Sequence, residues 1–174
     1  MQRLTLAGGI PDALKGSIVA LGNFDGFHLG HQAVVSRAIA RGFHERRPVI
    51  VATFEPHPVR FFKPDVPPFR LTTLDQREQL FAHAGADAML VFEFGAELAA
   101  MDAEEFVSDV LATQIGAAGV VTGDDFSFGK GRRGGRRHRR RFQLRQGAQR
   151  RPRAAEDSGR AARRGGRGGR SGRA

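Results

Sequence analysis

Two histidines three residues apart, His28 and His31, are the groups in this chain whose type and spacing could do chemistry. They lie in the string GNFDGFHLGH, residues 22–31, between an apolar run and a segment with helical spacing. A glycine-rich turn lets the backbone approach a ligand closely, and a helix N-terminus offers unpaired N–H groups and partial positive charge. This order is typical of phosphate sites, where both histidines could donate hydrogen bonds to a polyphosphate.

Other roles for these residues stay open on the sequence alone. A zinc site needs about four N, S or O ligands, and no third ligand is evident near His28 and His31. The two histidines could also be plain N-cap residues of the helix. Asn23 and Asp25 both suit turn conformations. We expect Asn23 to contact the ligand and Asp25 to support the loop.

Charge divides the chain into two parts. Residues 1–131 hold eleven Lys and Arg against sixteen Asp and Glu, a net charge of −5. Residues 132–174 hold seventeen Arg against two acidic residues, a net charge of +15, so the overall +10 describes neither part. The first part is long enough for one domain with a core. The absence of cysteine excludes disulfides and thiolate metal sites.

Alternating apolar runs and helical patterns favour a doubly wound α/β fold. Four short apolar runs predict strands covered on both faces; they are 18–22, 49–54, 88–92 and 119–122. Apolar spacing predicts a helix over 32–41, and capping boxes predict helices that begin at Thr73 and Asp102 and end near Gly85 and Gly116. Ligands of such parallel sheets bind at the carboxyl ends of the strands.

A proline-rich segment follows the run 49–54. Its beginning, EPHP at residues 55–58, would end strand pairing. The next stretch, 60–70, is predicted to be a loop or flap in which Phe61, Phe62 and Phe69 cluster. These rings either pack over the sheet edge or form an apolar wall for a flat ring of a ligand.

Two carboxylates, Asp124 and Asp125, follow the run 119–122. Such a pair can hold Mg²⁺ through water or accept hydrogen bonds from a ring N–H. Phe126 and Phe128 alternate with a serine, so both rings would lie on one side of an extended segment. The alternative is that both rings belong to the core.

Four segments together resemble the adenylyltransferase module of the bacterial bifunctional riboflavin kinase/FAD synthetase family. The motif from His28 to His31 matches the His-x-Gly-His signature of the nucleotidylyltransferase superfamily, and the longer string around it is far more specific. The other matching segments are TFEPHP at 53–58, RLTTL at 70–74 and GDDFSFGKG at 123–131. The resemblance extends from about Ser17 to about Arg133.

This resemblance implies an incomplete Rossmann-like nucleotidylyltransferase domain over 1–133 that transfers AMP from ATP to FMN, giving FAD and pyrophosphate. It implies catalytic roles for His28 and His31, with Mg²⁺ held through the ATP phosphates rather than by protein ligands. The ATP and phosphate contacts would come from Gly22, Asn23, Phe24 and Gly30. The flavin or active-site pocket would contain Pro56, His57, Pro58, Phe62, Asp125 and Phe128.

The Arg/Gly-rich tail, 134–174, departs from that family. It contains no Ser-Ser-Thr-x-x-Arg motif and no β-rich kinase pattern, so we expect no riboflavin kinase activity. Its low apolar content predicts disorder. The tail is a nucleic-acid-binding segment, a functionless extension or the product of a reading-frame shift in a GC-rich gene, and we favour the frameshift.

Two alternatives to FAD synthesis follow from these observations. The chain could be an inactive fragment whose basic tail binds nucleic acid without sequence preference. It could also be another His-x-Gly-His nucleotidylyltransferase, although the segment TFEPHP argues against this. The N-terminal residues show no signal peptide or sustained apolar stretch, so we expect a cytoplasmic protein with no membrane partner.

Overall fold

The computed structural model of the 174-residue chain describes residues 1–67, 69–124, 126, 128 and 129. Asp125 and the tail 134–174 lie outside the described residues. The expectations about the flavin contact of Asp125, the disorder of the tail and its binding of nucleic acid therefore stay predictions.

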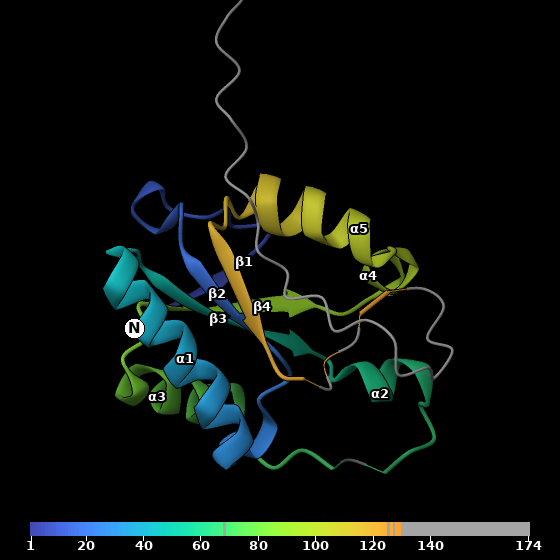
Figure 1. The fold of residues 1–174 in the computed structure, drawn as a ribbon. Coiled ribbons are helices and arrows are strands. Elements are labelled where there is room, and N and C mark those ends of the chain that lie inside the picture. The colour runs from blue at the N-terminus through green and yellow to red at the C-terminus, as the bar shows by residue number, and fades with distance from the viewer. Residues whose placement is uncertain (68, 125, 127, 130–174) are drawn as a thin grey trace, which may run out of the picture.

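A five-stranded parallel sheet forms the centre of the described part (Figure 1). Its spatial order is β1-β4-β3-β2-β5. The strands are β1 Gln2–Thr5, β2 Ile18–Leu21, β3 Val49–Glu55, β4 Ala88–Glu93 and β5 Gly119–Thr122. The four strands predicted from apolar runs are confirmed, with ends that differ by at most one residue. The additional strand β1 buries only Leu4, so its sequence has no continuous apolar run.

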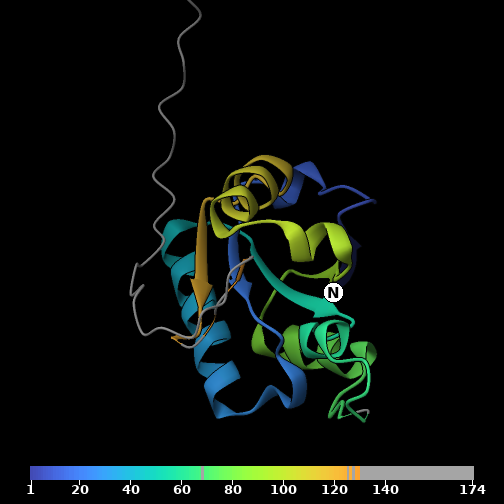
Figure 2. The same ribbon diagram turned by 90° about the vertical axis from the view of Figure 1, so that its right-hand side faces the viewer.

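Helices cover both faces of the sheet (Figure 1, Figure 2). Helices α1 (Leu29–Glu45) and α3 (Leu74–Ala84) lie on one face. On the other face, α5 (Ala103–Glu105) continues into the π-helical segment η3 (Phe106–Gln114). Two single 3₁₀ turns, η1 and η2, span Asp12–Leu14 and Asp25–Phe27. This two-sided cover confirms the doubly wound α/β prediction.

The predicted helix starts are confirmed by their hydrogen bonds. Thr73 and Gln76 form both bonds of a capping box at the start of α3, and Asp102 and Glu105 do so before α5. Helix α1 begins three residues earlier than the predicted 32–41, because His28 itself caps it.

Two short helices lie where sequence patterns indicated none. Helix α2, Pro58–Phe62, occupies the start of the stretch 60–70, which was expected to be a loop, and that part of the expectation is wrong. Proline at its first turn is compatible with helix, since the missing N–H would be unpaired there anyway. Helix α4, Ala96–Ala100, follows β4.

The core consists of one apolar cluster on each face of the sheet. Phe54, Phe92 and Phe106 belong to the cluster beneath η3, whereas Phe24 and Phe81 belong to the cluster beneath α1 and α3. The central strands are therefore buried on both faces, which explains their continuous apolar runs. In the described residues, no helix is long and apolar enough to cross a membrane.

Candidate active site

A tight turn connects β2 to α1 at the carboxyl edge of the sheet. Phe24, Gly26 and Phe27 have φ angles of 49°, 73° and 37°, so the chain passes through the left-handed region three times. Glycine adopts this region without strain, and a Cβ on Gly26 would lie 2.7 Å from Leu71 Cδ1. The backbone conformation and the close contact with Leu71 therefore both require glycine at position 26. The turn places His28 at the N-terminus of α1.

His28 and His31 lie against each other at this N-terminus. Their rings are stacked with centroids 3.6 Å apart and planes inclined by 23°. His28 Nδ1 accepts a hydrogen bond from the His31 backbone N–H at 3.4 Å. The neutral His28 ring then carries its proton on Nε2, which can donate to a ligand. A Cβ on Gly30 would lie 3.1 Å from His28 Cε1, so the ring occupies the space above that glycine.

Phe24 packs against the His31 ring of the histidine pair. Its ring is 1% exposed and meets the His31 ring edge-on at 5.4 Å. It also meets Phe81 of α3 edge-on at 5.7 Å, so it connects the turn to the core. The first turn of α1 contains no acidic residue, which keeps the helix N-terminus favourable for an anion.

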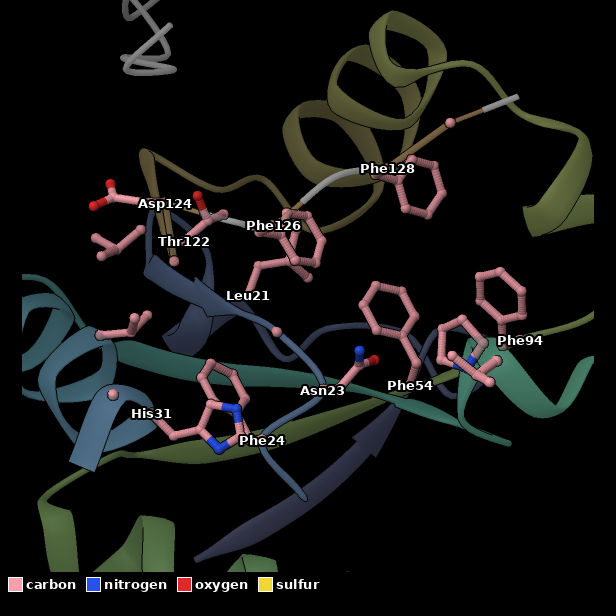
Figure 3. Close-up of a pocket in the computed structure, with 18 of the residues that line it drawn as sticks. Leu21, Asn23, Phe24, His31, Phe54, Phe94, Thr122, Asp124, Phe126 and Phe128 are labelled. Atoms are coloured by element: carbon pink, nitrogen blue, oxygen red, sulfur yellow. The ribbon is translucent and has the colours of Figure 1, made fainter. Parts of the chain in front are cut away.

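A cavity of about 1040 Å³ opens at this edge of the sheet. In Figure 3, His31, Thr122 and Asp124 form a polar end, and Phe54, Phe94 and Phe128 gather toward an aromatic end. Asn23 lies between the two ends. An arrangement of this kind suits a ligand that carries phosphate at one end and a flat ring at the other.

The aromatic end is a set of packed rings. Phe54 meets Phe94 edge-on at 5.8 Å and lies parallel to Phe128 at 6.2 Å. Phe128 in turn stacks on Phe106 at 4.0 Å. Phe126 also lies parallel to Phe54, at 6.4 Å. Phe126 and Phe128 thus pack against the core and also line the cavity, so the two expectations for them were not exclusive.

Most of the site residues expected from the sequence meet at this cavity. Those that line it are Gly22, Asn23, Phe24, His28, Gly30, His31, Pro58, Phe62 and Phe128. Pro56 and His57 are not among its lining residues. The His57 Nδ1 accepts a hydrogen bond from Val59 N–H at 3.2 Å, and its ring meets Phe69 edge-on at 5.1 Å. His57 thus caps the N-terminus of α2.

The cavity also includes residues that sequence reasoning missed. Phe94 and Leu98, 6% and 7% exposed, contribute to its apolar wall, and Arg37 and Lys63 bring positive charge to its lining. Phe94 lies two residues after the predicted strand 88–92 and directly after β4, and this closeness to a strand end was the signal that could have placed it at a carboxyl end. Arg37 had no such signal, because its position depends on how α1 lies over β5.

Asp25 fastens the turn to a segment 46 residues away. Its carboxylate accepts hydrogen bonds from the backbone N–H groups of Leu71 and Thr72 and from the Thr72 hydroxyl, at 2.8–3.1 Å. Burial raises the pKa of Asp25, but these bonds and the nearby Arg77 charge lower it by more, so its pKa lies below the ordinary value. Asp25 therefore supports the loop, as its turn chemistry predicted.

Within the part of the chain that the structure describes, no group of three His, Cys, Asp or Glu side chains is arranged to hold a metal ion. Asp124 is the described carboxylate that lines the cavity. A Mg²⁺ ion bound to a polyphosphate obtains most of its ligands from phosphate and water. The groups that line the cavity are therefore compatible with a Mg²⁺ ion that binds together with the polyphosphate that coordinates it.

Comparison with known proteins relates this geometry to one family. A sequence model of the FAD synthetase family matches residues 10–155. The chain is 38% identical over 120 residues to a bifunctional riboflavin kinase/FMN adenylyltransferase of Escherichia coli K12, covering 69% of this chain and 38% of that protein. It is 38% identical over 115 residues to the protein of the same name from Pseudomonas fluorescens, covering 66% and 37%. The chain thus spans well under half the length of these curated relatives.

A solved structure shares the fold. The chain superposes on a crystal structure described as a macrolide-efflux protein from Streptococcus pneumoniae with a TM-score of 0.67. The two are 25% identical, and the match covers 74% of this chain and 50% of that one. The family match includes the histidine turn and every described residue that lines the cavity. By its sequence, and with a fold that agrees, this chain belongs to the FAD synthetase family.

Proposed function

We propose that this chain is an FMN adenylyltransferase, which transfers AMP from ATP to FMN and releases pyrophosphate. The observation that carries the proposal is the stacked pair His28 and His31 at a helix N-terminus, facing a cavity with an aromatic end. The names of the relatives, which span more than this chain, support the same reaction.

The proposed reaction needs no activating base. An FMN phosphate oxygen attacks the α-phosphorus of ATP, the new P–O bond forms, and the bond to the oxygen bridging the α- and β-phosphates breaks. Pyrophosphate leaves with that bridging oxygen and its electron pair. Catalysis then depends on in-line positioning and stabilisation of charge. His28, His31 and the N–H groups of α1 would stabilise the transferring phosphoryl group and the leaving pyrophosphate.

The remaining assignments follow from the same proposal. ATP would lie along Gly22, Asn23 and Gly30, with Mg²⁺ bound to its phosphates. The isoalloxazine ring would lie against Phe62 and Phe128, with Phe24 holding the histidine turn. Pro56, His57, Pro58 and Asp125 would shape the flavin side of the site. We further propose that the protein carries out this reaction in the cytoplasm.

The test is formation of FAD by the full 174-residue chain from FMN, ATP and Mg²⁺, followed by chromatography. We expect His28→Ala and His31→Ala each to lower turnover by about 100-fold or more, because each removes a donor to developing phosphate charge. His44→Ala is the matched control, since His44 lies exposed at the far end of the same helix.

The outcome that contradicts the proposal is equally direct. If the unsubstituted chain forms FAD and both histidine variants keep its turnover, the histidine turn is not the catalytic element. If the chain forms no FAD but adenylylates or cytidylylates a different phosphate, it is another His-x-Gly-His nucleotidylyltransferase. Formation of neither product would favour the inactive fragment.

A further inference from the structure

Among the residues that the structure describes, Arg77 is the buried charged residue that the proposed reaction leaves without a role. It lies on α3 and is only 2% exposed, although it does not line the cavity. A buried guanidinium is costly unless its N–H groups are paired. Its contacts therefore indicate which parts of the molecule it holds.

One side of the guanidinium reaches the turn that precedes the histidines. Nη1 donates to the Asn23 carbonyl at 3.3 Å and to Thr53 Oγ1 at 3.2 Å. The Thr53 hydroxyl donates to the same Asn23 carbonyl at 2.7 Å. Asn23 is therefore tied by its backbone to the end of β3 as well as to α3.

The other side of the guanidinium reaches the segment fastened by Asp25. Nε donates to Thr72 Oγ1 and Nη2 donates to the Thr72 carbonyl, both at 3.2 Å. Nη2 also lies 3.5 Å from the Asp25 carboxylate. Thr72 Oγ1 accepts a further bond from Gly26 N–H at 3.0 Å. Both ends of the turn thus converge on one side chain.

The shape of this side chain matters as much as its charge. A guanidinium is a planar fork whose donors point in fixed directions, and it can hold acceptors on two sides at once. A lysine ammonium could pair with Asp25, but a single nitrogen cannot span the carbonyls of Asn23 and Thr72. The fork therefore fixes the distance between the turn and the segment 70–73.

We propose that Arg77 is a positioning residue: it holds the turn from Asn23 to Gly26 in the one geometry that places His28 and His31 against the phosphates. It acts through the turn and touches no reacting atom. The kinetic part of this inference rests on the proposed function, whereas the structural part concerns only the two histidine rings.

The test uses the full chain with Arg77→Met, Arg77→Lys and Thr53→Val. The first readout is the NMR spectrum of the His28 and His31 ring C–H groups without substrate, with His44 as an internal reference. We expect the His28 and His31 signals to move in all three variants. The second readout is FAD formation, where kcat should fall about 10- to 100-fold while KM for FMN changes less than about threefold.

Arg3→Met is the matched control. Arg3 also anchors α3, donating to Glu78 at 2.8 Å and pairing with Asp75, but it does not touch the turn. We expect Arg3→Met to leave the His28 and His31 signals unchanged and to change the melting temperature only slightly, because its ion pairs are exposed. If Arg77 only stabilised the fold, Arg77→Lys would, like Arg3→Met, leave the His28 and His31 signals unchanged.

The proposal is overturned if Arg77→Lys and Thr53→Val leave both histidine signals in place, or if they keep the kcat of the unsubstituted chain. These two variants decide the matter if Arg77→Met does not fold. If the unsubstituted chain forms no FAD, the proposed function fails, and the histidine spectra still decide whether Arg77 positions the turn.

Discussion

Asp25 shows how one carboxylate in the turn before His28 holds two distant segments together. It collects three donors from Leu71 and Thr72, and the guanidinium of Arg77 lies beside it. Because these partners stabilise the charged form, the pKa of Asp25 is lower in the folded chain than in the unfolded one. Through these hydrogen bonds, protonation of Asp25 is coupled to the free energy of unfolding.

We expect Asp25→Asn to lower the free energy of unfolding by about 2 kcal/mol near neutral pH, as for hydrogen bonds to charged groups. A depressed folded pKa contributes stability above the unfolded value of about 3.9, and this is lost as the pH falls through the folded pKa. The difference between the two chains should therefore shrink toward pH 2, as measured by urea unfolding from about pH 7 downward.

The control for this pH dependence is Asp12→Asn. The pKa of Asp12 is also lowered, by a hydrogen bond from Lys15, but this carboxylate is exposed. Surface pairs contribute little to stability, so Asp12→Asn should leave unfolding almost unchanged at every pH. An Asp25→Asn deficit that is equal in acid and at neutral pH would contradict the assignment.

At the scale of the elements, the caps decide where the site-bearing segments begin. Thr73 ends the segment fastened by Asp25 and starts α3, the helix that carries Arg77. Its hydroxyl accepts from Gln76 N–H at 3.2 Å, and the Gln76 side chain accepts from Thr73 N–H at 2.9 Å. Loss of this cap would loosen the helix end nearest to the turn.

We expect Thr73→Ala to lower the free energy of unfolding by about 1 kcal/mol, since it leaves helix donors without a partner. Ser36→Ala provides a matched hydroxyl removal, because Ser36 is exposed within α1 and should tolerate alanine. Urea unfolding of both variants measures the difference. Equal stability of the two variants would show that the capping box contributes nothing.

At the scale of the whole molecule, the sheet joins two apolar layers that meet the same cavity from opposite faces. Phe106 of η3 supports Phe128 from one face, and Phe81 of α3 supports Phe24 and Phe27 from the other. Both supporting rings are essentially unexposed. Neither layer can therefore be lost without changing the cavity.

We expect Phe106→Ala and Phe81→Ala each to lower the free energy of unfolding by about 3–5 kcal/mol, in a single cooperative transition. The exposed Phe43, 88% accessible, supplies the control, and Phe43→Ala should change stability by less than about 0.5 kcal/mol. Separate transitions for the two variants in calorimetry would contradict the view that the sheet couples both layers.

The amino-acid sequence by itself determined the element types and the turn that carries His28 and His31. Strands β2 to β5 follow from apolar runs, and α3 and α5 follow from caps, because both signals depend on neighbouring residues. The family was also readable from short motifs around the histidines, and the family match over residues 10–155 confirmed it. The catalytic roles of the two histidines stay predictions.

Only the tertiary structure decided how distant residues meet. The edge strand β1 depends on pairing with β4, since only one of its residues is buried. The burial of Arg77 depends on acceptors at Asn23 and Thr53, which lie 54 and 24 positions away. Phe94 reaches the cavity only because β4 ends beside β3. The spacing of neighbouring residues indicates which segments form helices and strands. The burial of a charge or a ring depends on partners that are distant in the sequence and meet only in the folded chain.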